Sequence, residues 1–570
     1  MSINIKLRKY CYFMNSEGKE KNTLRLLLFG SFFTTIALSP WLNEEPVNYV
    51  KLVSLASAAC ALLVSFLIPS VREILKNDRF ISALILLFSV QALISTLTSS
   101  DAKTQNFYGV FGRNTGFLTY FSLSVIFLSA TQLRRYESFN KIIKILFYSG
   151  LVNIVYCLSV IFGYDPIPWE NIFGAPLGTF GNPNFIGAFL GFIFVLCFVY
   201  LLQNAASMRT KASILLLLTL LGFEIHKTNA IQGIVVALIG VSFTLFLYMR
   251  SKELSSYITS AYVFIITSVG ILGVMGALQV GPLTSIIYKS SISLRGVYWM
   301  AGIKTGLANF WLGAGMDSYG TWFRRSRDIT KLGPDVITNS SHNVFLDLFA
   351  SGGIILVTSY ILINGFVAIQ ILRHIKKFRT YDPVFVSLSA VWICYQAQSL
   401  ISINQIGLAV WGWVLGGSIL AYVKLGVVEG GKSGSGISKR APLKSVEVAA
   451  STVLLSLAGA LIGFAVSLPP LLADANWRSA LNSKDRDVFE SALHQWPRDP
   501  VRYAKGLRIY LENNIQDKSY STAKSATIEF PNDYYSWYNL GIIPSISASE
   551  KAEVERQLKR LDPNNPKRPW

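Results

Sequence analysis

Over most of its length the chain consists of long apolar runs separated by short polar connections. Runs of about 17–25 apolar residues, the length that crosses a bilayer as a helix, can be placed at about thirteen positions. They cover residues 23–42, 50–70, 80–99, 116–132, 142–163, 185–203, 212–226, 230–249, 258–280, 343–371, 383–402, 405–424 and 446–468. The pattern therefore predicts an all-α, polytopic membrane protein.

Lysine and arginine gather in alternate connections between these runs, and the N-terminal segment is basic as well. The basic connections lie around residues 72–79, 134–141, 209–211, 250–252, 373–379 and 432–444. Because cytoplasmic loops carry an excess of Lys and Arg, this alternation predicts a cytoplasmic N-terminus. An odd number of spans then places everything after Pro469 on the outer side of the membrane.

The predicted organisation follows from these positions. A cytoplasmic tail (1–22) precedes a membrane domain (23–424) that contains a long outer loop (281–342). A Gly/Ser-rich, basic cytoplasmic linker (425–445) leads to the last span (446–468), and an extracytoplasmic helical domain (469–570) follows.

The last hundred or so residues are polar and contain a recurring turn sequence. It reads Trp496-Pro497-Arg498-Asp499, then Phe530-Pro531-Asn532-Asp533, then Leu561-Asp562-Pro563-Asn564. Pro531 lies 34 residues after Pro497, which is the tetratricopeptide period. We predict a small α-helical, tetratricopeptide-like domain. Because so few repeats are marginally stable alone, we expect it to dock on the outer face of the membrane domain, where it could also bind a protein partner.

Composition excludes other classes of protein. Hydrophobic residues make up 52% of the chain, charged residues 15%, and the mean hydropathy is +0.42, which is too apolar for a soluble globular protein. The net charge of +20 lies mainly in the short loops, so it indicates membrane orientation rather than nucleic-acid binding. The cysteines have no paired spacing and no histidine clusters beside them, so we expect neither disulfides nor a metal site.

The long outer loop contains the first candidate for chemistry, Arg295. It lies in the segment from Ser291 to Trp299, which we predict to be an amphipathic helix on the outer membrane surface. A planar, permanently charged guanidinium suits a phosphate oxygen near the interface. The alternative is an arginine that merely reaches the lipid headgroups.

His342 lies at the other end of this loop, just before the apolar run 343–371. At a helix N-terminus the dipole disfavours the imidazolium, so His342 should be neutral near pH 7 and able to accept a proton from a hydroxyl. A capping or loop-stabilising histidine is the alternative. Asp347, four residues after Asn343, lies on the same helical face as Asn343, and we expect it to pair with a basic or amide group inside the bundle.

Two further outer connections contain polar candidates. Arg113, in the segment 111–116, could be a second phosphate ligand or another interfacial arginine. Asn182, in the segment 178–184, has a turn role as its simplest explanation, because glycines and a proline surround it. No acidic cluster accompanies these residues, so arginines rather than a metal would have to neutralise a bound diphosphate.

At these residues the chain resembles the bacterial O-antigen ligase and polymerase family, multispanning glycosyltransferases that act on glycans linked to undecaprenyl diphosphate. The similar pieces are Gly178-Thr179-Phe180-Gly181-Asn182-Pro183-Asn184, Arg295 with Tyr298-Trp299, Leu312-Gly313-Ala314-Gly315, and Ser341-His342-Asn343-Val344-Phe345-Leu346-Asp347 running into Gly352-Gly353. They extend over about residues 105 to 420. Members of the family often have a serine-arginine pair near the middle spans, where this chain has Thr228 to Gly233, including Gln232.

The resemblance implies a metal-independent enzyme without a cofactor in the bacterial inner membrane. Arg295 and His342 would be catalytic, and Arg113, Asn343, Asn182, Gln232 and Trp299 would bind substrate. The donor would be an undecaprenyl-diphosphate-linked glycan. The acceptor is left open between a lipid (ligase), a second lipid-linked glycan (polymerase) and a protein (O-oligosaccharyltransferase). A non-enzymatic transporter of lipid-linked sugars is the alternative of another class.

Overall fold

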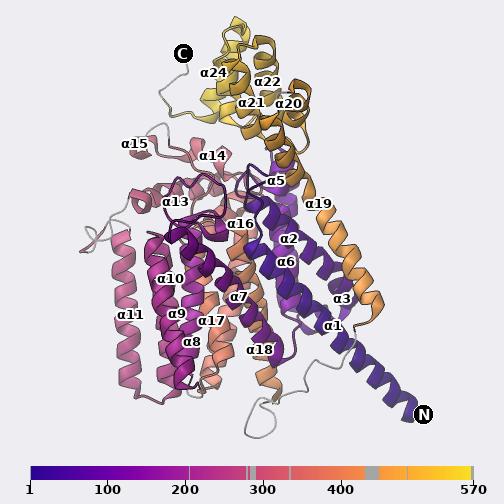
Figure 1. Ribbon diagram of the computed structural model, residues 1–570, viewed down its shortest axis with the longest axis vertical. Helices are drawn as coiled ribbons and strands as arrows, with labels where there is room; N and C mark the ends of the chain where they lie inside the picture. Colours follow the sequence, from indigo (N-terminus) through magenta and orange to yellow (C-terminus); the bar gives the residue numbers. More distant parts are fainter. Residues whose placement is uncertain are drawn as a thin grey trace.

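The computed structural model describes residues 2–203, 206–277, 280–282, 290–332, 336–429, 448–483 and 485–565, which form helices and connections without a β-strand (Figure 1). The helices before the long loop are α1 (Ser2–Ile36), α2 (Asn48–Leu62), a π-helical turn (Leu63–Leu67), α3 (Ile68–Asn77), α4 (Arg79–Thr98), α5 (Lys103–Tyr108), α6 (Phe117–Ala130), α7 (Tyr136–Ile161), a 3₁₀ turn (Gly178–Phe180), α8 (Pro183–Leu201), α9 (Met208–Lys227), α10 (Ile231–Ser251) and α11 (Ser256–Ala277). Those after it are α13 (Ser290–Ala308), α14 (Tyr319–Ser326), α15 (Ile329–Leu332), α16 (Val344–Lys377), α17 (Pro383–Ser399), α18 (Ile406–Glu429) and α19 (Ala450–Asn482). The C-terminal helices are α20 (Arg486–His494), α21 (Pro500–Glu512), α22 (Gln516–Glu529), α23 (Tyr534–Gly541) and α24 (Ala548–Leu561).

The predicted all-helical fold is thus confirmed for these residues. Each of the predicted membrane spans overlaps a helix. In the described part of the chain, nine helices are long and apolar enough to cross a membrane: the continuous stretch from α2 through α3, and α4, α7, α8, α10, α11, α16, α18 and α19. This is the composition of a multi-pass membrane protein. The full count of thirteen stays a prediction, because α9 and α17, for instance, are not among the nine.

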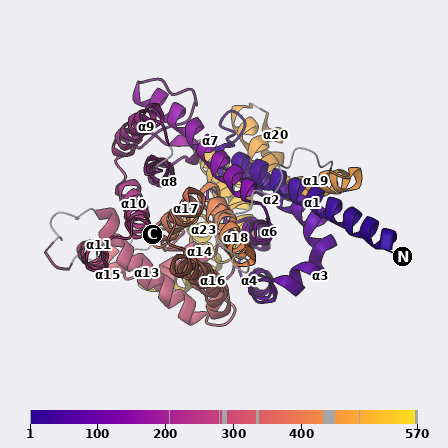
Figure 2. The ribbon, with the colours of Figure 1, turned by 90° about the horizontal axis from the view of Figure 1, so that it is seen from below.

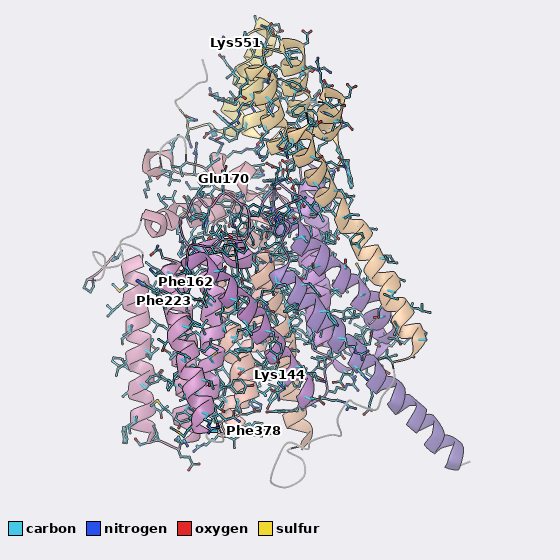
Figure 3. The ribbon with its side chains drawn as sticks, in the orientation of Figure 1. Lys144, Phe162, Glu170, Phe223, Phe378 and Lys551 are labelled. Carbon is cyan, nitrogen blue, oxygen red and sulfur yellow. The ribbon has the colours of Figure 1, made fainter. Side chains whose placement is uncertain are left out.

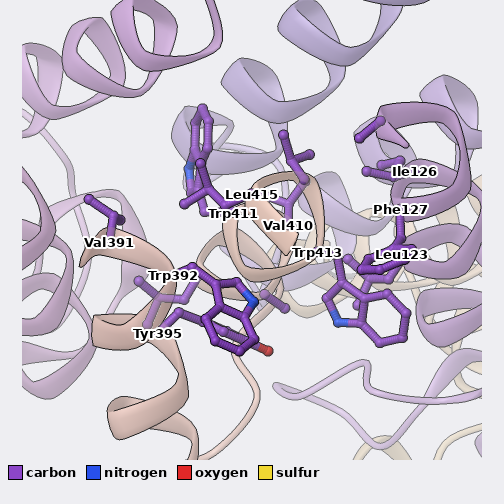
Figure 4. Close-up of a cluster of buried hydrophobic side chains, with 14 of the residues drawn as sticks. Leu123, Ile126, Phe127, Val391, Trp392, Tyr395, Val410, Trp411, Trp413 and Leu415 are labelled. Carbon is purple, nitrogen blue, oxygen red and sulfur yellow. The ribbon is translucent and has the colours of Figure 1, made fainter. Parts of the chain in front are cut away.

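Helix α18 lies at the centre of the bundle, and its apolar stretch is completely buried. Trp413 of α18 packs edge-on against Phe127 of α6, with ring centroids 6.0 Å apart, and Leu123 lies beside it (Figure 4). Trp411 is fully buried, and its indole N–H donates to the Thr35 hydroxyl of α1 over 2.8 Å. In contrast, α11 lies at the edge of the bundle (Figure 2), with no residue of its apolar stretch buried.

The long loop packs against the bundle at a break inside α16. Gly353 has φ +70° there, so the helix is interrupted and frees backbone groups. The segment around 310–315 uses them: Ala314 N–H donates to the Ala350 carbonyl over 2.8 Å, and Ile354 N–H donates to the Phe310 carbonyl over 2.7 Å. A Cβ on Gly313, which has φ +74°, would overlap the Ser351 carbonyl oxygen. The glycine-containing segments 310–315 and 350–354 therefore pack directly against each other.

The C-terminal helices follow without a break from the membrane bundle. Helix α19 continues through Pro469 and Pro470 to Asn482, so the predicted boundary at residue 469 lies inside a helix rather than in a linker. Likewise the predicted tail 1–22 belongs to α1, and α18 extends into the predicted linker as far as Glu429. The remainder of that linker, and residues 283–289 of the predicted outer loop, lie outside the described residues.

The recurring turns of the C-terminal helices face the bundle. The Asn532 amide donates to Asp101 Oδ1 over 2.9 Å and to the Ser100 hydroxyl over 3.0 Å. The Asp562 carboxylate, 1% exposed, accepts from Arg324 over 3.0 Å and from Arg327 over 2.6 Å. Because α14 and its flanks supply these arginines, the long loop lies between the bundle and the C-terminal helices (Figure 1).

The side-chain view shows the two ends of the bundle. Glu170, in the predicted outer connection 164–184, lies toward the end that carries the C-terminal helices, whereas Phe378, in the basic connection after α16, lies at the opposite end (Figure 3). Lys551 marks the far tip of the C-terminal helices in the same view.

Replacing Gly313 with alanine should destabilise the protein by more than about 1–2 kcal/mol, the usual cost of a left-handed backbone for an L residue. The overlap with the Ser351 carbonyl adds to that cost. Thermal unfolding in detergent, followed by tryptophan fluorescence, measures the effect. Gly365→Ala is the matched control, because it lies within α16 with nothing near its Cβ position. A melting temperature that is the same in wild type and in both variants would contradict the packing of Gly313 against Ser351.

Asp562→Asn should loosen the C-terminal helices, because it leaves Arg324 and Arg327 buried without a counter-charge. Breaking one partner of a buried ion pair typically costs about 3–5 kcal/mol. Hydrogen–deuterium exchange of α21 to α24 should become faster. Glu553→Gln removes an exposed partner of Arg556 and is the control, expected to leave exchange unchanged. Identical exchange in wild type and Asp562→Asn would show that this ion pair does not hold the helices in place.

Candidate functional site

A cavity of about 770 Å³ lies between the bundle and the C-terminal helices. One wall comes from residues around 104–113, 294–298, 320–324 and 337–342, and the other from residues around 470–477, 497–505 and 533–535. Of the residues predicted for the site, His342 and Arg113 line this cavity. Its size is typical of a site for a small organic ligand.

His342 has a left-handed backbone, with φ +57°, immediately before α16. Its amide donates to the Ser340 hydroxyl over 3.0 Å, and its ring packs beside Tyr298 with centroids 5.4 Å apart. A histidine adopts this backbone conformation only when its surroundings hold it there. The conformation turns the imidazole toward the cavity rather than along the helix.

Asp347 provides much of that constraint from the first turn of α16. One carboxylate oxygen accepts from the Ser341 amide over 2.6 Å, and the other accepts from the Ser340 hydroxyl over 2.6 Å. The amide that pairs with Asp347 is therefore the backbone N–H of Ser341, the residue directly before His342. Asp347 clamps the loop that carries the imidazole.

The imidazole is neutral near pH 7. Burial, together with the charges of Arg295 and Arg113, lowers the pKa of His342 to about 4. Its Nδ1 lies 3.2 Å from the Ser340 carbonyl oxygen, which can only accept, so Nδ1 carries the hydrogen. Nε2 then has the free lone pair and can accept a proton. The expected neutrality thus has burial and two arginines as its causes, in addition to any helix dipole.

Arg113 is held by a turn that Asp317 stabilises. Its Nε donates to the Asn339 side-chain oxygen over 3.0 Å. The Asp317 carboxylate accepts from the amides of Val110 and Thr115 over 2.8 and 3.2 Å, which bracket Arg113. Burial raises the pKa of Asp317, and these amides and the Arg113 charge oppose that rise. Arg113 also lines the cavity.

Arg295 lies on α13, one residue from Leu294, which lines the cavity. Its Nε is buried and has no hydrogen-bond partner among the described residues. Burial lowers the pKa of Arg295, and its charge acts on His342. The structure therefore groups Arg295, Arg113 and His342, the three charged or titratable residues of the predicted site.

The other predicted site residues lie outside the cavity wall. Asn343 caps α16, accepting from the amides of Phe345 and Leu346, and donates to the Leu400 carbonyl. Asn182 caps α8. Gln232, on α10, is buried with both amide atoms unpartnered within the described structure. Trp299 lies on α13, and its indole nitrogen is buried and has no partner among described residues.

Sequence reasoning did not single out Asp317 and Asn339, which hold Arg113. Both lie in polar connections without a recurring pattern, and their contacts are with residues more than two hundred positions away. The wall made by the C-terminal helices was missed as well. The recurring turns were its only signal, because Pro497 and Asp499 of the first turn and Asp533 of the second line it.

In comparisons with known proteins, no protein-family model matches the chain and no curated protein matches it. Within the described ranges, no group of three or more His, Cys, Asp or Glu side chains could hold a metal ion. The site is therefore interpreted from its own geometry.

His342 should stay neutral at pH values where an ordinary histidine is protonated. Its pKa of about 4 means that acylation by diethyl pyrocarbonate, which needs the neutral ring, keeps nearly the same rate from pH 7 to 5.5. An unstructured histidine peptide, with a pKa of about 6.5, should slow about tenfold over that range. Mass spectrometry of the His342 peptide gives the rate.

Arg113→Gln removes one of the two charges that lower this pKa, so it should shift the pH dependence of acylation upward. The free energy of unfolding should depend on pH as well. Because the pKa of His342 is lower in the folded protein than in the unfolded chain, its contribution to stability decreases as pH falls from about 6.5 to about 4. A His342 rate that falls as steeply as that of the peptide would contradict this environment.

Proposed function

We propose that the protein transfers a glycan from undecaprenyl diphosphate to an acceptor hydroxyl, as O-antigen ligases do. The observation that supports this proposal best is the grouping of a neutral histidine, with its Nε2 free to accept a proton, with two arginines beside a cavity of about 770 Å³. These are the groups that a charged leaving group and a hydroxyl nucleophile require.

The two arginines would hold the diphosphate. Arg113 lines the cavity and donates one N–H group to Asn339, and the Nε of Arg295 is buried without a hydrogen-bond partner in the described structure. Partly buried guanidinium groups beside a cavity favour an anion between them. With its charge matched in this way, the diphosphate is a good leaving group, so electrostatic stabilisation rather than a general acid supports its departure.

His342 would act on the acceptor. The hydroxyl oxygen attacks the anomeric carbon of the donor sugar and forms the new glycosidic bond. The bond from that carbon to the diphosphate oxygen breaks, and undecaprenyl diphosphate leaves with the electron pair. The hydroxyl proton passes to His342 Nε2, because Nδ1 already carries its hydrogen for the Ser340 carbonyl.

In this proposal the membrane topology is the predicted one. The N-terminus and the basic connections lie in the cytoplasm, about thirteen spans cross the bacterial inner membrane, and the cavity opens on the outer face beneath a tetratricopeptide-like domain. The glycan donor reaches the arginines from the bilayer. Lipid, glycan and protein acceptors use the same chemistry, so a polymerase and a protein O-oligosaccharyltransferase remain alternatives of the same class.

The test is transfer from a purified undecaprenyl-diphosphate-linked glycan in detergent, without added metal, with products analysed by mass. Arg295→Ala and Arg113→Ala should each lower the rate by about 10²–10³, the usual cost of losing one transition-state donor. His342→Ala should lower it by about 10²–10⁴. The mass of the product names the acceptor class.

His226→Ala and Arg508→Ala are matched controls, because both side chains are exposed and lie outside the cavity. They should retain wild-type rates. Full activity in folded Arg295→Ala and His342→Ala would show that the site is elsewhere. Translocation of the donor lipid in liposomes, with no transfer to any acceptor, would instead favour a transporter.

A further inference from the structure

The wall of the cavity opposite His342 belongs to the C-terminal helices. It includes the turns before α21 and α23 and the first residues of both helices, together with Trp477 of α19. If the cavity carries out glycan transfer as proposed above, this wall faces a part of the substrate that the arginines do not hold. Its chemistry indicates which part.

The charged groups of this wall are already engaged within the protein. Asp499 caps α21 and Asp533 caps α23. Lys505 pairs with Glu44 over 3.0 Å. Arg502 donates to backbone carbonyls, among them that of Gln495 over 2.7 Å. These groups stabilise the wall, so a ligand would meet few unpaired charges there.

Unlike these charged groups, the two adjacent tyrosines of α23, Tyr534 and Tyr535, bring uncharged aromatic rings to the wall. Tyr535 is 41% exposed, and Tyr534 is half-buried beside it. The Arg324 guanidinium lies 4.1 Å from the Tyr534 ring centroid and 5.0 Å from that of Tyr535, while Asp562 holds its Nη1. The two tyrosine rings are nearly perpendicular, with centroids 5.7 Å apart. The cavity thus has aromatic rings beside phenol and guanidinium hydrogen-bonding groups, and Tyr298 adds another ring next to His342.

We propose that Tyr534 and Tyr535 form a saccharide-binding wall. A sugar ring has an apolar C–H face and a rim of hydroxyl groups, so it needs a flat aromatic surface with polar groups at its edge. A lipid tail would need an apolar wall, and this one includes several polar side chains. A phosphate would need unpaired cations, whereas Arg498 and Lys505 are ion-paired and both terminal nitrogens of Arg502 donate to carbonyls.

The placement of the wall agrees with this assignment. The diphosphate would lie at Arg113 and Arg295, on the bundle side, because its lipid tail stays in the bilayer. The sugar at the reacting carbon lies next to the diphosphate, and the glycan continues from there into the cavity. The opposite wall is where further sugar rings of the donor, or of a glycan acceptor, come into contact with the protein.

This wall depends on the docking of the C-terminal helices. Asp533 and the tyrosines directly follow Asn532, which Ser100 and Asp101 hold. The Asp562 carboxylate fixes Arg324 between the bundle and the tyrosine rings. The C-terminal helices therefore determine which glycan fits, in addition to any partner they bind.

The experiment has two readouts on the full-length protein in detergent. One is binding of the free oligosaccharide, released from the donor by mild acid, measured by saturation-transfer NMR. The other is transfer kinetics, with KM for donor and acceptor measured separately. We expect Tyr535→Ala and Tyr534→Ala to weaken oligosaccharide binding about tenfold and to raise one KM about tenfold, with kcat within about twofold. A rise in the KM for the donor means that the wall binds the donor glycan, and a rise in the KM for the acceptor means that it binds the acceptor glycan.

Ile542→Ala is the matched control, since Ile542 is also 41% exposed and directly follows α23 but does not line the cavity. Tyr535→Phe should bind nearly as well as wild type, which separates ring contact from misfolding. Unchanged oligosaccharide binding in both tyrosine variants, or no binding by wild type, overturns the saccharide wall even where transfer occurs. Tyrosine-dependent binding without any transfer supports the wall and rejects the proposed function.

Discussion

The carboxylate of Asp347 is the constraint on which the candidate site depends. It lies in the first turn of α16 and holds the Ser341 amide and the Ser340 hydroxyl at once. Without those bonds, the left-handed backbone of His342 would be free to relax, because a non-glycine residue keeps that conformation only under restraint. The Asn343 cap fixes the start of α16 on the other side of His342. The helix that follows therefore fixes the backbone of His342, and the ring is held by its own contacts with the Ser340 carbonyl and Tyr298.

That placement explains the electrostatics of the proposed reaction. With Nδ1 donating to the Ser340 carbonyl, only Nε2 is left to accept a proton, and burial together with the nearby arginines keeps the ring neutral. The same positive charges that disfavour an imidazolium favour a diphosphate. A bound diphosphate would offset them and make His342 more basic once the donor is present. In this account the donor itself would activate the base.

Much of the fold follows from local patterns in the sequence. Apolar runs of membrane-spanning length place the helices, and the recurring proline turns mark the C-terminal hairpins. The break in α16 and its fit to the segment 310–315 do not follow from such patterns, because they join residues that are distant in the chain. For the site, residue chemistry pointed to Arg295, His342 and Arg113, which the fold brings near one another. It could not separate these from Asn343 and Asn182, whose side chains cap helices, or find Asp317, which acts through contacts that only the folded chain brings together.

The most direct measurement is a cryo-electron microscopy map of the protein with undecaprenyl diphosphate bound. The account predicts that the diphosphate lies between Arg113 and Arg295, with guanidinium nitrogens about 3 Å from its oxygens. His342 Nε2 should face the open space beside it, toward the C-terminal helices. Diphosphate density at another place on the protein, with Arg113 and Arg295 both unchanged and unoccupied, would contradict the account.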